Sequence, residues 1–362
     1  MDIVSVTGDF GLTQFRDSFL SDLHIDASNA TWDLANIGET TNRYPFIVTD
    51  SSHLVLAGGT INGQVSLTLD WKTAYVNSAA VFARDSEDIH FKDWRISQAW
   101  DGIRITGHDE AEFEISNVWM SNIRDDGIEN DRGLSGTIRD SMMDGVFVGI
   151  SLYEDDTNNQ KDQTVTLDNV LIRMESFSYK NEMTHQPFFK YDGDVSPKLS
   201  IHNSVFAIDL IDHEGLGRLE DAWDNVVDAS NNYFLNLTDD PIPSSYPLPQ
   251  SGFTILNGAE ARAFWENART EFVVNFLGQV LDEEPAPSGL VMLEQEFVDK
   301  IFDVFIWRES GGSSSEDTTS AAGQLPLQGF QTDNAVAKEE GPIFEYPVPD
   351  FGIDVFGSFD FV

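Results

Sequence analysis

Two stretches of this sequence place acidic side chains close together, in a pattern that suits proton transfer. The segment RDDGIENDR (124–132) carries four carboxylates and two arginines around one Gly-Ile pair, and WDGIRI (100–105) repeats the Asp-Gly-Ile element. Crowded carboxylates cannot all ionise freely, so one of them can keep its proton and serve as a general acid. We therefore predict that Asp101, Asp125 and Asp126 form a catalytic acid–base set.

The side chains next to these carboxylates suit the binding of a sugar. Trp100 directly precedes Asp101 and can stack on a sugar ring. Arg104 or Arg124 can hold a carboxylate or sulfate group through paired hydrogen bonds. We predict these three residues, together with Glu129, to be substrate-binding.

The same residues also have plainer interpretations. In Asp-Gly-Ile the Asp can cap a turn while the Gly supplies an unusual φ. Arg104 and Glu129 can form a surface ion pair worth about 0–1 kcal/mol. Acidic clusters of this kind also bind Ca2+ through carboxylate oxygens, although the chemistry predicted here requires no cofactor.

The overall charge restricts the partners of the chain. Its 362 residues include 62 acidic and 21 basic side chains, which gives a net charge of −41. Phosphates would be repelled, so we expect no binding to nucleic acid or to anionic membrane surfaces. The charge suits a salty exterior, Ca2+ binding, or simply solubility.

Other absences in the sequence narrow the functional classes. The chain has no cysteine, which excludes disulfides, thiolate metal sites and thiol nucleophiles. No run of 18 apolar residues predicts a membrane-spanning helix, and the first residues do not resemble a Sec signal peptide. The seven histidines show no metal-ligand spacing.

An internal repeat organises the middle of the chain. Apolar or small residues recur at positions −4, −2 and +3 around an Asn, Asp or Gly. The anchor positions are Gly58, Asp93, Asn117, Asp140, Asn169, Asn203 and Asn231. From residue 93 onward their spacings are 24, 23, 29, 34 and 28 residues. Such short units cannot bury an apolar face alone, so we predict that they stack as a right-handed parallel β-helix, an all-β solenoid. Strands at this spacing also fit a β-sandwich.

Stacking assigns the acidic residues to one wall. Strand alternation places Arg104, Glu129 and Ser151 in one outward column, and Asp101 next to Asp126 in another. Neighbouring carboxylates would then lie about 5 Å apart, within the range used in sugar hydrolysis. We expect the longer connections at 153–163 and 178–197 to leave the repeat as loops that wall a groove over Asp126.

The ends of a stack expose strand edges and need covers. We predict a cap with the first coil over 1–44, in which Phe15, Phe19 and Leu23 share one face of a helix. The stacked repeat follows over 45–240, and a C-terminal cap helix (257–278) with a linker lies within 241–289. An acidic, partly flexible extension occupies 290–362, and its low-complexity stretch favours a flexible linker.

The repeat region, about residues 45–240, resembles the pectin-lyase-like superfamily of right-handed parallel β-helices. Within it, WDGIRI and RDDGIEN are similar to the polygalacturonase family, whose Asn-Thr-Asp and Asp-Asp motifs match Asp101, Asp125 and Asp126. The family's Asn-Thr is replaced by Ala99 and Trp100, and its Gly-His-Gly histidine by Val148. Its Arg-Ile-Lys motif has only two loose counterparts, which are Arg173 and Lys180.

This resemblance implies glycoside hydrolase chemistry on a polysaccharide, one that could itself be acidic, by a bacterial protein that is secreted or at the cell surface. Two other functions remain open at this point. One is a non-catalytic surface, adhesion or assembly protein, which uses the repeat as a rigid scaffold and self-associates through the repeat or the C-terminal tail. The other is a polysaccharide lyase with an Arg or Lys base and Ca2+.

Overall fold

The computed structural model describes residues 1–34, 44–108, 110–153 and 159–282; for residues 279–282 it describes the backbone alone. This part of the chain is one compact unit. It is mostly β, with a large sheet of 22 strands, all of whose pairings are parallel. The predicted all-β class is thus confirmed at this level. The expected linker and extension lie largely outside the described residues.

The strands pair in three ladders, each of which takes one strand or strand segment from successive repeats. Ladder A uses the first parts of the two long strands β15 and β16. Its members are β1 (Asp2–Ser5), β4 (Leu23–Asp26), β7 (Ser52–Ala57), β10 (Glu87–Lys92), β13 (Glu112–Ser116), β15 (Ser135–Ser151), β16 (Thr164–Met174), β20 (Lys198–His202) and β22 (Val226–Ser230).

Ladder B follows ladder A along the chain and uses later parts of the long strands. Its members are β2 (Gly8–Asp9), β5 (Ala30–Asp33), β8 (Thr60–Asn62), β11 (Arg95–Ser97), β14 (Trp119–Glu129), β15, β16, β21 (Val205–Ile208), β23 (Asn232–Asn236) and β24 (Phe253–Asn257).

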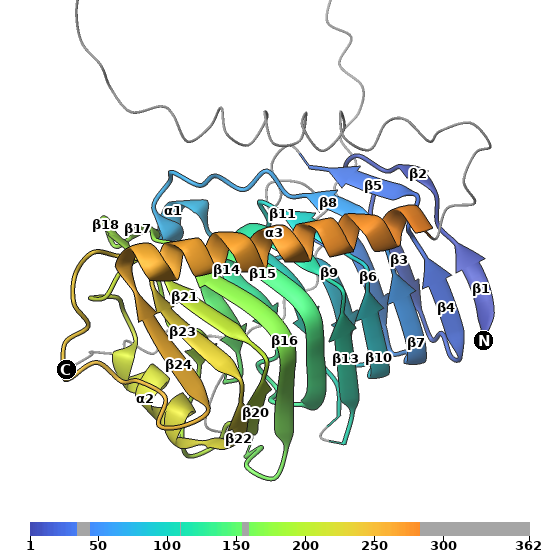
Figure 1. Cartoon of the computed structure of the whole chain (residues 1–362). Coiled ribbons are helices and arrows are strands. Elements are labelled where there is room, and N and C mark those ends of the chain that lie inside the picture. The colour runs from blue at the N-terminus through green and yellow to red at the C-terminus, as the bar shows by residue number, and fades with distance from the viewer. Residues whose placement is uncertain (35–43, 109, 154–158, 283–362) are drawn as a thin grey trace, which may run out of the picture. The chain divides into compact units, whose positions relative to one another are not determined.

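Ladder C comes third in the repeats up to β19 and carries the acidic residues. Its members are β3 (Phe15–Ser18), β6 (Phe46–Thr49), β9 (Ala79–Arg84), β12 (Asp101–Ile105), the ends of β14 and β15, and β19 (Phe189–Lys190). A separate antiparallel hairpin joins β17 (Phe177–Tyr179) to β18 (Glu182–Thr184). Figure 1 shows the strands of the ladders lying side by side.

The register of ladder A confirms the repeat found in the sequence. Ile89 pairs with Phe113, which pairs with Gly136, so successive strands are offset by the predicted spacings of 24 and 23 residues. Later pairings likewise match the longer spacings. All three ladders contribute to one hydrophobic core, as shown by Leu56, Ile61 and Val81.

The anchor residues form the turns between ladders A and B. All six Asn and Asp anchors have positive φ, between 48° and 62°, a conformation that these two residue types tolerate better than others. Their side chains also bond from one repeat to the next: Asn117 donates to Asp93 at 2.7 Å, and Asn169 donates to Asp140 at 2.8 Å. The anchor side chains therefore link one repeat to the next.

The N-terminal helix prediction was wrong. Phe15 begins strand β3 and Leu23 begins strand β4, whereas Phe19 lies in the turn between them, with a φ of 58° and a side chain that is 82% exposed. Spacings of four residues fit a strand as well as a helix, because four is a multiple of two. The ladders therefore begin at Asp2, well before residue 45.

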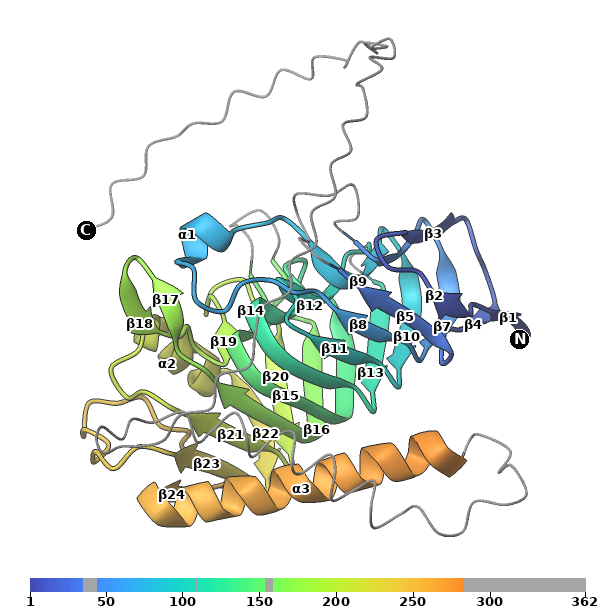
Figure 2. The same ribbon diagram turned by 90° about the horizontal axis from the view of Figure 1, so that it is seen from above.

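The three helices in the described part of the chain lie outside the ladders. They are α1 (Trp71–Ala74), α2 (Leu216–Asp224) and α3 (Gly258–Asp282). The C-terminal helix prediction is confirmed, although α3 continues past Gly278, and it covers a face rather than an end. It packs against outward side chains of ladder B, including Met142 and Leu171, through Trp265 and Phe276. Figure 2 shows α3 and α1 on opposite sides of the strands. Among the described residues, no helix is long and apolar enough to cross a membrane.

Candidate acid–base site

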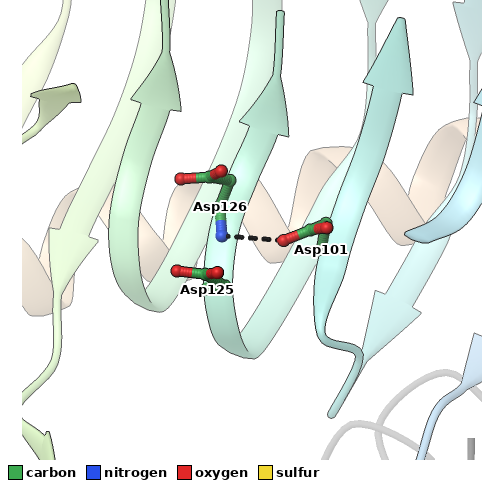
Figure 3. Close-up of side chains that lie close together, drawn as sticks. All are labelled: Asp101, Asp125 and Asp126. Carbon is green, nitrogen blue, oxygen red and sulfur yellow. Dashed lines mark hydrogen bonds between the residues drawn. The ribbon is translucent and has the colours of Figure 1, made fainter. Parts of the chain in front are cut away.

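The three predicted aspartates come together on ladder C. Asp101 begins β12, while Asp125 and Asp126 lie on the neighbouring strand β14. The backbone N–H of Asp126 donates to Oδ1 of Asp101 at 3.1 Å, as Figure 3 shows. One carboxylate oxygen from each of the three lies within 4.8 Å of the others. The stacking that we predicted from the repeat is therefore confirmed.

The glycines beside these aspartates are required by close packing and not by φ. Neither Gly102 nor Gly127 has a positive φ, so the turn interpretation of Asp-Gly-Ile was wrong. A Cβ on Gly102 would lie 2.4 Å from the backbone oxygen of Gly127, and a Cβ on Gly127 would lie 2.7 Å from that of Gly149. This column of glycines lets neighbouring strands pair closely where the carboxylates project.

The predicted column next to the aspartates is also confirmed, and it is longer than expected. Arg104 pairs in register with Glu129, and Glu129 with Ser151. Ser151 in turn pairs with Lys190 on β19, a residue that the sequence analysis missed. Nε of Arg104 lies 3.1 Å from Oε2 of Glu129. Lys190 therefore brings a second cation to this wall.

Burial and mutual repulsion raise the pKa values of these carboxyls. Asp101 and Asp126 are only 4% and 5% exposed, and burial, followed by neighbouring carboxylates, raises the pKa of each well above its ordinary value. Burial raises the pKa of Asp125 to about 6, against the opposing hydrogen bond from the Trp71 indole. Adjacent carboxyls thus differ in their tendency to hold a proton.

The cluster continues through Glu129 and Asp131. Burial raises the pKa of Glu129 to about 7, although the Arg104 guanidinium opposes this shift. Asp131 accepts a hydrogen bond from the Ser151 hydroxyl, and its Oδ1 lies 3.7 Å from Nζ of Lys190. Burial alone would lower the pKa of Lys190, but nearby carboxylates, with Asp126 first among them, raise it.

One buried oxygen in the cluster, Oδ1 of Asp126, lacks a hydrogen-bond partner among the described residues, whereas Oε2 of Glu129 has Nε of Arg104 at 3.1 Å. Two carboxylate triads have oxygens near enough to share a cation: Asp101, Asp125 and Asp126, and Asp126, Glu129 and Asp131. Calcium takes six to eight oxygen ligands, and Arg104 and Lys190 already offset part of the charge. We therefore assign no metal to this cluster.

The predicted roles of Trp100 and Arg124 were wrong. Trp100 is 2% exposed, and it packs against the rings of Trp71 and Tyr75, so it presents no face to a sugar. Arg124 is fully buried; it donates to the backbone oxygens of Ser66 and Leu69, and its guanidinium lies over the ring of Phe177. Arg124 therefore anchors the segment 66–77, which we call the strap, against ladder C.

The strap and the β17–β18 hairpin (177–184) meet beside Asp125. Asp70 of the strap accepts from the backbone N–H of Asn181 at 2.9 Å, and the rings of Trp71 and Tyr179 meet edge to face. The indole of Trp71 donates to Asp125 at 3.2 Å. Trp71 and Tyr179 are partly exposed and Tyr75 is 50% exposed, so they supply the aromatic surface that we had assigned to Trp100.

The walls near the acidic residues therefore differ from those predicted. The 178–197 connection is largely structured, since it contains most of the hairpin and strand β19. The other predicted loop includes residues 154–158, which lie outside the described residues. The strap was not predicted at all. Of the two loose counterparts of the Arg-Ile-Lys motif, Arg173 bonds to Asp144 and Lys180 lies over the ring of Tyr179.

Comparisons with known proteins add no assignment. No protein-family model, no curated protein and no solved structure matches this chain.

Proposed function

We propose that this chain is a secreted or surface-exposed right-handed parallel β-helix protein that cleaves glycosidic bonds in a polysaccharide. The three ladders follow one another in the order A, B, C in successive repeats and share one core, which supports a helical winding. A right-handed sense is favoured because nearly all crossovers between parallel strands have that hand.

One observation carries the chemical part of the proposal. Asp125 has a pKa of about 6, whereas burial and charge repulsion raise the pKa values of Asp101 and Asp126 well above their ordinary range. Neighbouring carboxyls with separated pKa values are the arrangement in which one acts as an acid and another as an anion. At neutral pH, Asp125 is mostly ionised, whereas Asp101 and Asp126 hold a proton more readily than ordinary aspartates do.

In the proposed reaction, a protonated carboxyl of this pair gives its proton to the glycosidic oxygen as the carbon–oxygen bond breaks. The carboxylate of Asp125 stabilises the positive charge that develops at the anomeric carbon, and water completes the hydrolysis. The Trp71 indole holds Asp125 in place, while the partly exposed rings of Tyr75 and Tyr179 offer stacking surfaces. Lys190 and Arg104 limit the negative charge of the cluster.

The rival proposal is a non-catalytic scaffold, and one observation favours it. Asp101 and Asp126 are almost fully buried, and the strap and hairpin lie beside them. A scaffold would keep this cluster closed, whereas an enzyme must admit a sugar to Asp125. The enzyme proposal predicts a cleavage activity that is lost in Asp125→Asn, whereas the scaffold proposal predicts no cleavage activity at all.

The decisive experiment is a screen of polysaccharides for the release of reducing ends between pH 4 and pH 8. We expect activity in the wild type and a loss of at least about a hundredfold in Asp125→Asn and in Asp126→Asn. Glu112→Gln, an exposed carboxylate on β13 outside the cluster, is the matched control and should retain full activity. Equal activity of Asp125→Asn and the wild type would reject the acid–base assignment. The release of unsaturated products would instead indicate a lyase.

A further inference from the structure

A second surface of the molecule has the composition of a binding groove. An open hollow of about 800 Å3 lies between α3 and the turns that join ladders A and B. It extends along several repeats, since its lining runs from Asn117 to Tyr233 on the strand side and from Phe264 to Gly278 on the helix. Ligand pockets commonly have this size. The hollow shares no residue with the carboxylate cluster.

We propose that this groove binds an uncharged oligosaccharide chain. One wall is the row of anchor amides, which includes Asn117, Asn169 and Asn203. Amide groups offer both donors and acceptors, as do sugar hydroxyls. Each of these amides uses one N–H in a bond to the preceding repeat, at 2.7 or 2.8 Å, which fixes its direction. The second N–H of each amide remains for a ligand.

The opposite wall, which is formed by α3, presents the rings of Phe264 and Phe272, and Tyr233 on the strand side packs against Phe264. Tyr233 and Phe264 lie with ring centroids 4.2 Å apart, and Phe272 follows two helical turns later along α3. These three side chains are partly exposed, so each keeps some ring surface toward the groove. Flat apolar rings opposite a row of fixed amides match the two kinds of surface on a sugar ring, its C–H faces and its hydroxyl edges.

The charges of the groove favour a neutral ligand over an acidic one. Its charged lining consists of Arg139, Asp140 and Glu271, and Arg139 is already paired with Glu114 and Asp140. The chain as a whole carries a net charge of −41 and repels polyanions. A peptide strand would need an unpaired strand edge, but the strands behind these turns are paired on both sides.

This proposal does not require that the chain be an enzyme, and its test separates the two questions. We suggest calorimetric titration of the full chain in the Asp125→Asn background, so that the proposed cleavage cannot consume the ligand. The probes are hexasaccharides of β-1,4-linked glucose, xylose and mannose, with a hexagalacturonate as the acidic comparison. We expect at least one neutral probe to bind, and the acidic one to bind more weakly.

The decisive variant is Asn169→Gly/Asn203→Gly, because glycine keeps the positive φ of both turns while removing both amides. We expect affinity to fall about tenfold or more, since two hydrogen bonds are lost. Asn231→Gly is the matched control: it has the same φ and also donates to the preceding repeat, but it does not line the groove. If the double variant does not fold, Phe272→Ala on the opposite wall replaces it, with Phe19→Ala as the exposed-ring control.

Three results would overturn the proposal. They are the absence of binding to every neutral probe, equal affinity in the double variant and its parent, and an equal loss in Asn231→Gly. Cleavage of a polysaccharide with no binding in the Asp125→Asn background would support the acid–base site and reject this groove. Binding without cleavage in the wild type would do the reverse.

Discussion

Two regions of the molecule bury carboxylates. One region surrounds its carboxylate with arginines, whereas the other surrounds its carboxylates with further carboxylates. On ladder B, Asp144 lies beneath α3, and each of its oxygens is 2.6 Å from an arginine nitrogen, one from Arg173 and one from Arg269. On ladder C, Asp101 and Asp126 face further carboxylates. Burial opposes ionisation at both places, yet the two arginines hold the pKa of Asp144 below its ordinary value.

This difference separates a structural network from a candidate reactive one. The negative charge of Asp144 is paired with the positive charges of Arg173 and Arg269, and these ion pairs hold α3 against the sheet. A ligand would therefore find no unpaired charge at Asp144. The ladder C cluster contains Asp101, Asp125, Asp126, Glu129 and Asp131, but among the described residues its direct ion-pair partners are only Arg104 and Lys190. Burying carboxyls with too few cations beside them lowers the stability of the folded state, and such arrangements are common at functional sites.

The largest predicted effect is on the compensated side. We expect Asp144→Ala to lower the free energy of unfolding by about 3–5 kcal/mol, because it leaves two arginines beneath α3 without their partner. Urea unfolding at neutral pH measures this value. A loss below about 1 kcal/mol would contradict the view that Asp144 fastens the helix.

The second prediction concerns pH. Asp125 and Glu129 have pKa values of about 6 and about 7 in the folded chain, above their ordinary values, so the folded state binds more protons than the unfolded state between about pH 4 and pH 7. Their contribution to stability is therefore present at low pH and is lost as the pH rises through this window, by on the order of 3 kcal/mol for each carboxyl.

The pH prediction needs an internal comparison, because other groups titrate nearby. Burial lowers the pKa of His185 to about 4 and that of His213 to about 3, so these rings weaken the fold as the pH falls below the ordinary histidine value. The difference between the wild type and Asp125→Asn/Glu129→Gln isolates the carboxyl contribution. We expect the double variant to lose less stability between pH 4.5 and pH 7.5, and parallel curves would refute the assignment.

In the ladder C cluster, we expect a smaller effect on stability, and one opposite in sign to that of Asp144→Ala. Asp126→Asn resembles the protonated carboxyl and removes one of the repelling charges. We expect it to raise the free energy of unfolding at pH 7.5 by on the order of 1 kcal/mol. Thermal and urea unfolding of this variant beside Asp144→Asn test the comparison directly, since the same chemical change should stabilise one region and destabilise the other.

The repeat could be read from the sequence because its turns demand particular residues. The Asn and Asp anchors occupy positions of positive φ, and that demand recurs every 23 to 34 residues from Asp93 onward. The resulting register correctly placed Asp101 beside Asp126 and Arg104 beside Glu129. These are local properties of the chain.

What the sequence did not reveal depends on long-range packing. Lys190 pairs with Ser151 at an offset of 39 residues, whereas the preceding pairs of this column are offset by 25 and 22, so no regular period connects them. The strap buries Trp100 through Trp71 and Tyr75, although its own sequence resembles an ordinary surface connection. The sequence predicted a helix over 257–278, but it could not indicate that this helix covers ladder B.

The smallest predicted effect lies within α3 itself, where two arginines allow a matched comparison. Arg262 pairs with Asp239 at 2.9 Å, and these side chains are 44% and 86% exposed, whereas Asp144, the partner of Arg269, is buried. We expect Arg262→Ala to cost about 0–1 kcal/mol, as for other exposed ion pairs, and to cost less as salt is added. Arg269→Ala should cost clearly more and respond little to salt. Urea unfolding at low and high salt measures both losses of stability. Equal losses in Arg262→Ala and Arg269→Ala would show that the docking of α3 depends on its total charge. The burial of Asp144 would then not be what distinguishes the two regions.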